Sequence, residues 1–104
     1  MAKSFFVLKA KSSDGYYDDH AKYHVMADND PYEICFCETY DDAKKMLVKE
    51  SHKVREFDWM ELVYCREDDT NIVKRYAEYD KRHNRYTEGF EVIWWITEIE
   101  FTKP

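Results

Sequence analysis

The last strand-like stretch of the chain, residues 90–101 with the sequence FEVIWWITEIEF, most constrains the fold. Side chains of a strand alternate between its two faces, so this stretch carries apolar residues on both. One face takes Phe90, Val92, Trp94 and Ile96, and the other takes Ile93, Trp95, Ile99 and Phe101. A strand that is apolar on both faces belongs inside a sheet, covered on both sides or covered by a partner on one.

Length and composition predict one folded domain spanning residues 1–104. The chain is 44% hydrophobic and 17% aromatic, which is typical of a globular protein. Its net charge of −6 argues against a simple electrostatic binder of nucleic acid or of an anionic membrane. No apolar run reaches the roughly 18 residues that span a bilayer, and no signal peptide is evident. We therefore expect a cytoplasmic protein that does not bind membranes.

The order of predicted elements is β-β-β-α-β-α-β, an α+β domain. We expect a mostly antiparallel or mixed sheet of four or five strands with two helices on one face. Asp14-Gly15 predicts a hairpin turn, residues 28–31 (DNDP) break the return strand, and Gly89 precedes the final strand as a turn residue. The predicted strands cover residues 4–11, 16–27, 33–38, 56–66 and 90–101.

Two segments are predicted to be helical. The first runs from Thr39 to about Val54, with the Thr39 hydroxyl as N-cap and Asp41 and Asp42 in the first turn, where the helix dipole favours negative charge. The second runs from Thr70 to about His83. Its apolar stripe at helical spacing consists of Ile72, Val73, Tyr76, Tyr79 and His83.

No motif in the sequence indicates a catalytic, metal or cofactor site. Cys35 and Cys37 do not have the spacing of a zinc knuckle, and the odd number of cysteines favours reduced thiols. Acidic residues around Cys37 would raise the pKa of its thiol. With only two glycines, the chain has no phosphate-binding loop and no nucleophile elbow. An enzyme using cysteine or carboxylate chemistry is the weakest of three alternatives.

Charge is unevenly distributed along the sequence. The stretch 14–42 is strongly acidic, and we predict that its early aspartates form a partner-binding surface: Asp14, Asp18, Asp19, Asp28 and Asp30. The stretch 74–86 is basic and interleaved with tyrosines, which resembles single-strand nucleic-acid surfaces. The alternative hypothesis is therefore a nucleic-acid-binding second helix, using Lys74, Arg75, Lys81, Arg82 and Arg85.

The number of aromatic residues exceeds what two short helices need to pack against. We predict an aromatic sheet face that anchors a partner, formed by Trp59, Trp94, Trp95 and Phe101. The leading hypothesis is a non-catalytic, acidic protein-binding module whose partner is a host protein or a second copy in a homodimer. In general style the chain is similar to small phage accessory proteins, which implies an inhibitor or anti-defence protein acting on a host machine.

Overall fold

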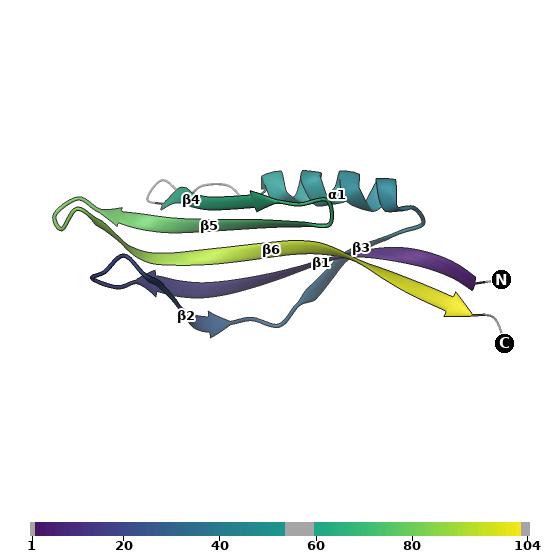
Figure 1. Cartoon of the computed structure of the whole chain (residues 1–104), viewed down its shortest axis with the longest axis horizontal. Coiled ribbons are helices and arrows are strands. Elements are labelled where there is room, and N and C mark those ends of the chain that lie inside the picture. The colour runs from purple at the N-terminus through teal and green to yellow at the C-terminus, as the bar shows by residue number, and fades with distance from the viewer. Residues whose placement is uncertain (1, 54–59, 103–104) are drawn as a thin grey trace.

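The computed structural model describes the backbone of residues 2–53 and 60–102, and the side chains of residues 4–53 and 60–100. Its elements form a small, elongated α+β domain of 62 × 22 × 18 Å (Figure 1). In chain order they are β1 (Ala2–Tyr17), β2 (Tyr23–Asp28), β3 (Tyr32–Cys37), α1 (Tyr40–Lys53), β4 (Met60–Glu67), β5 (Asn71–Asp80) and β6 (Arg85–Thr102).

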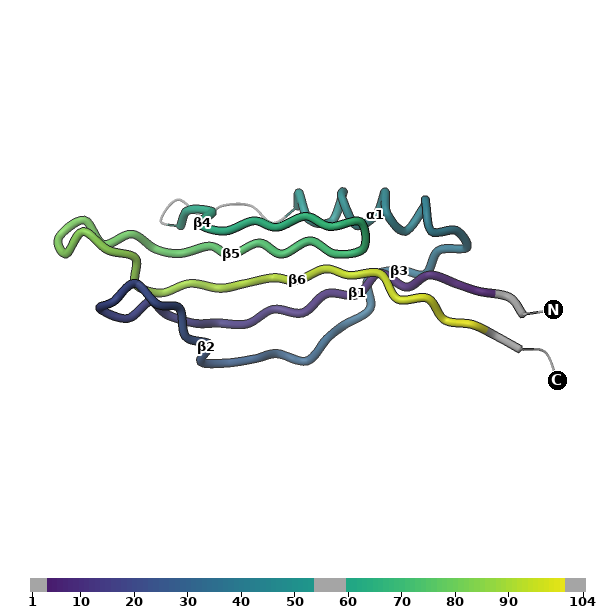
Figure 2. Tube along the Cα trace, in the orientation of Figure 1, coloured from purple at the N-terminus to yellow at the C-terminus, as the bar shows by residue number. Residues whose placement is uncertain are grey.

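All the strands belong to one antiparallel sheet in the order β2-β1-β6-β5-β4. At its centre, β1 and β6 pair continuously from Ala2↔Thr102 to Tyr16↔Glu88. β3 also pairs with β1, beyond the end of β2. Figure 2 traces β2 and β3 as one path along β1, bent between the two strands at residues 29–31. The expected break at this point is thus present.

The first predicted helix is confirmed as α1. The Asp42 amide donates to the Thr39 hydroxyl at 3.2 Å, so Thr39 is the N-cap. Ala43 and Leu47 bury one face of α1 against the sheet. The central cluster under the helix consists of Leu8, Ala10, Leu47, Ile72, Val92 and Trp94.

The second predicted helix is wrong, because residues 71–80 form strand β5. This strand pairs with β4 on one side and β6 on the other, which satisfies its backbone groups between two neighbours. Ile72, Val73 and Tyr76 are β-branched or aromatic residues that suit a strand as well as a helical stripe. The described residues therefore form one helix and six strands, where two helices and four or five strands were expected.

Both glycines lie inside long strands, so the turns predicted at these positions are also wrong. Gly15 lies in β1, where a bulge shifts the pairing with β2, and Gly89 lies in β6. The chain turns instead at residues 18–22 and 81–84. These two turns lie at the same end of the sheet, opposite the chain ends, and α1 covers the half nearer the chain ends (Figure 1).

The sheet has an α1 face and an opposite face, here called the far face. Trp94 lies under α1 and is 2% exposed, while its neighbour Trp95 lies half-buried on the far face. Val7 and Val73 are buried on the far face although the only described helix covers the other side. Long side chains in neighbouring strands, such as Lys9 and Arg75, can cover such residues with their apolar stems.

Candidate functional site

The predicted aromatic patch is not brought together among the described residues. Trp94 is in the core and has no surface to offer a partner, so its assignment to a partner site does not fit the structure. Trp95 is half-buried between Lys9 of β1 and Asn71 of β5. Trp59 and the side chain of Phe101 lie outside the described residues.

The far face carries a cluster around Arg75 instead. The guanidinium of Arg75 forms an ion pair with Glu91 at 2.7 Å and lies 4.3 Å from the ring centroid of Tyr23 and 5.1 Å from that of Tyr64. Tyr23 reaches Arg75 from β2, across β1 and β6. Burial and, next, the Glu91 carboxylate raise the pKa of Tyr23. The cluster is thus a cross-sheet contact that spans β2 to β4.

The five basic residues of the nucleic-acid hypothesis are dispersed, because no second helix exists to align them. Lys74 is buried on the α1 face and donates to the Ser51 carbonyl at 3.0 Å. Arg75 is on the far face in the Glu91 ion pair. Lys81, Arg82 and Arg85 lie in or beside the turn at residues 81–84, so the predicted basic helical surface is wrong.

The predicted acidic residues follow β1, β2 and the turns that flank β2. Asp18 lies 2.6 Å from His24 Nε2, and this hydrogen bond is the main cause that lowers the pKa of Asp18 to about 2. Asp19 forms an ion pair with Arg85, and Asp28 with Lys11 at 2.8 Å. Asp14 and Asp30 are exposed, and no ion pair is described for either. The acidic charge is therefore partly neutralised at the turn and less so near residue 30.

The cysteines do not form a reactive or metal-binding centre among the residues described. The sulfurs of Cys35 and Cys37 are 3.8 Å apart as free thiols. Burial and the neighbouring Cys37 raise the pKa of Cys35 to about 11, which keeps its thiol protonated near neutral pH. Within the described ranges, no three His, Cys, Asp or Glu side chains lie where they could hold a metal ion.

One outer edge of the sheet exposes large apolar side chains. This β2–β3 edge carries side chains that are each more than half exposed: Val25 at 58%, Met26 at 64%, Tyr32 at 53% and Phe36 at 62%. In the described part of the chain, β2 and β3 pair only with β1, so their outer backbone groups have no strand partner. These four residues were missed from the sequence because apolar alternation alone does not distinguish an edge strand from a central one.

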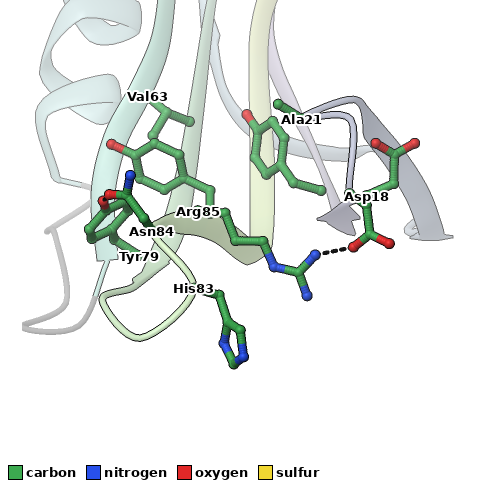
Figure 3. A pocket seen from close by; sticks show the side chains of 10 residues that line it. Asp18, Ala21, Val63, Tyr79, His83, Asn84 and Arg85 are labelled. Carbon is green, nitrogen blue, oxygen red and sulfur yellow. Dashed lines mark hydrogen bonds and ion pairs between the residues drawn. The ribbon is translucent and has the colours of Figure 1, made fainter.

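A pocket, here called the tip pocket, lies where the two turns meet at the end of the sheet (Figure 3). Its volume is about 570 Å³, within the range of small-molecule sites. Arg85 reaches across it to its ion pair with Asp19, while His83 points away (Figure 3). The lining residues are Tyr17, Asp18, Asp19, Ala21, Val63, Tyr79, His83, Asn84, Arg85 and Tyr86.

No family model matches the chain, and no curated protein or solved structure matches it either. Within the residues described, no helix is both long and apolar enough to cross a membrane.

Proposed function

We propose that the chain is a non-catalytic protein-binding module that takes up an extended segment of a partner along the β2–β3 edge. One observation carries the proposal: Val25, Met26, Tyr32 and Phe36 are all more than half exposed, and all lie on this edge. Folded proteins usually cover an apolar edge, because an open one pairs with other chains. An exposed apolar edge is favourable in a protein whose function is to pair with an extended segment of a partner.

The backbone of the edge supplies the affinity in this proposal. A peptide that adds as a new strand forms main-chain hydrogen bonds, and its alternate side chains contact the edge residues on each face. Val25 and Phe36 pair with Gly15 and Val7 of β1, which places both on the far face. The partner's apolar side chains would therefore lie on the same face as Trp95, the one residue of the predicted aromatic patch that is described there.

The charge of the edge favours a basic partner over a second copy. Asp28, Asp30 and Glu33 lie near its middle, and only Asp28 has a described ion pair, with Lys11. Two copies joined antiparallel through this edge would bring their acidic residues together, and like charges opposite each other destabilise strand pairs. A segment with Lys or Arg next to apolar residues complements both the acidic charge and the apolar side chains of the edge. The expectation that the partner is a host machine, which the chain inhibits, stays a prediction.

Binding of a defined peptide set tests the proposal. Fluorescence anisotropy with extended peptides that alternate Lys and Val should give saturable binding, and peptides with Glu in place of Lys should bind at least about tenfold more weakly. Val25→Glu combined with Phe36→Glu should abolish binding. Val48→Glu is the matched control, since Val48 is 44% exposed on α1, away from the edge.

Three results would overturn the proposal. They are equal binding of the acidic and basic peptides, unchanged binding by the edge variant, and self-association through this edge in sedimentation equilibrium. The last result would support the homodimer hypothesis instead.

A further inference from the structure

The tip pocket is a site apart from the β2–β3 edge, and three tyrosine rings form part of its walls. Tyr17, Tyr79 and Tyr86 all line it and are all half-buried. The Tyr86 ring centroid lies 5.2 Å from that of Tyr79 and 6.0 Å from that of Tyr17. Tyr79 and Tyr86 are cross-strand partners beside the turn at residues 81–84, and Tyr17, which is far from both in the sequence, joins them from β1.

The angles between the rings indicate the shape of the ligand. The plane of Tyr86 is inclined by 63° to Tyr79 and by 46° to Tyr17. A flat ligand such as a nucleobase stacks best between parallel walls. A rounded cation can instead be held by several ring faces that meet at angles, which is how aromatic cages recognise quaternary ammonium groups.

Hydrogen bonds within the protein hold the hydroxyl groups of two of the three tyrosines. Tyr86 donates to Glu61 Oε2 at 2.8 Å, and Tyr79 donates to Asn84 Oδ1. These bonds fix the rings, and a hydroxyl that donates to a carboxylate makes its ring more electron-rich. The Tyr86–Glu61 bond also places a negative charge behind the cage wall.

The charge at the tip pocket also favours a cation. Asp18 and Asp19 line the pocket, and the pKa of Asp18, lowered mainly by its hydrogen bond with His24, keeps that carboxylate ionised. Among the described lining residues the guanidinium is that of Arg85, which forms an ion pair with Asp19; the two side chains are 43% and 84% exposed. Such an exposed pair is weak, so Arg85 is a competitor that a ligand cation can displace.

We propose that the tip pocket binds a small organic cation that carries a trimethylammonium group. Tyr17, Tyr79 and Tyr86 surround the methyl groups, and Asp18 and Asp19 balance the charge. The site does not depend on the strand-addition function proposed above, because it uses different residues at the end of the sheet.

Titration of the full chain with tetramethylammonium and with choline tests the proposal, followed by NMR of labelled tyrosine rings at constant ionic strength. We expect saturable shifts confined to the three cage tyrosines. The neutral isostere of choline, 3,3-dimethylbutan-1-ol, should bind at least about fivefold more weakly, because it lacks the cation–π attraction. Equal binding of the isostere would overturn the proposal.

Single substitutions show whether the ring faces of the cage hold the cation. Tyr86→Leu should weaken choline binding about tenfold, whereas Tyr86→Phe keeps the ring and should weaken it much less. Tyr32→Leu is the control, since Tyr32 is an exposed tyrosine on β3. Arg85→Gln should tighten choline binding by about threefold or more, because it removes the internal competitor. Weaker binding by Arg85→Gln, or unchanged binding by Tyr86→Leu, would refute the proposed cation site.

Discussion

Gly15 and Gly89, the only two glycines in the chain, are cross-strand partners in β1 and β6. Neither is in a turn, and each allows a close approach by a neighbouring strand. A Cβ on Gly15 would lie 2.4 Å from the Tyr23 ring and 2.5 Å from the His24 carbonyl oxygen. A Cβ on Gly89 would lie 2.4 Å from the Tyr76 carbonyl oxygen. The missing side chain at Gly15 leaves room for Tyr23, whose ring contacts Arg75 on the far face.

Replacing either glycine by alanine should destabilise the fold. Gly89→Ala forces a methyl group against the backbone of β5, so we expect a loss of about 1–3 kcal/mol in the free energy of unfolding. Gly15→Ala should show a similar loss. Urea unfolding followed by circular dichroism measures both. Glu88→Ala, at an exposed position next to Gly89, is the control and should change stability little. A loss under about 0.5 kcal/mol for both glycine variants would contradict the close approach of neighbouring strands at these two positions.

Removing the Tyr23 hydroxyl should not destabilise the protein. The hydroxyl oxygen is buried and has no hydrogen-bond partner among the described residues, so it loses its water without compensation. Tyr23→Phe keeps the ring under Arg75 and should leave thermal stability unchanged or raise it, by up to about 1 kcal/mol. Tyr64→Phe, at a more exposed tyrosine in the same cluster, should have little effect. A clear loss of stability in Tyr23→Phe would mean that its hydroxyl has a partner.

Lys74 should stabilise the protein through its hydrogen bond to α1. Its ammonium is buried and donates to the Ser51 carbonyl near the C-terminal end of α1, where positive charge is favourable. Lys74→Met keeps an unbranched stem but removes the donor, so we expect a loss of about 1–3 kcal/mol in chemical denaturation. Lys81→Met, in the exposed turn, should be close to neutral. Equal stability of the two variants would show that the buried bond contributes nothing.

The turn at residues 18–22 should be sensitive to acid. Because the pKa of Asp18 is lowered from 3.8 to about 2, the ionised carboxylate stabilises the fold above about pH 3.8, and this contribution is lost as the pH falls towards 2. His24→Ala removes the hydrogen bond that is the main cause of the lowered pKa, so the pKa of Asp18 should move back towards 3.8. Carboxyl NMR titration measures the shift directly. His20→Ala is the control, since the bond from His20 to Asp18 uses the backbone amide and is kept. An Asp18 pKa unchanged by His24→Ala would exclude this mechanism.

Local signals in the sequence were enough to predict several elements. The Thr39 cap and the acidic first turn predicted α1 correctly, because capping depends on residues within a few positions of one another. The strand predicted over residues 90–101 was also correct, although β6 begins earlier, at Arg85. The helix predicted over residues 71–80 was wrong because the spacing of their apolar residues suits both a helix and a strand. The outcome depended on pairing with β4 and β6.

The candidate sites were the least predictable part. The four residues of the β2–β3 edge are exposed only because no further described strand pairs with β2 or β3. Tyr79 and Tyr86 meet across one hairpin, but Tyr17 joins them only because the turns at residues 18–22 and 81–84 lie at the same end of the sheet. Neither the open edge nor the meeting of the two turns has a local sequence signal.

From the sequence alone, residues 90–101 could be predicted to form a strand that is apolar on both faces, with Trp94 and Trp95 pointing in opposite directions. Alternation of side chains along a strand is a local property, so the pattern is readable without the fold. Which of the two tryptophans is buried was set by the fold, in which Trp94 lies under α1 and Trp95 lies on the far face. That choice depends on which side of the sheet α1 packs, a contact between segments about 50 residues apart that no local pattern encodes.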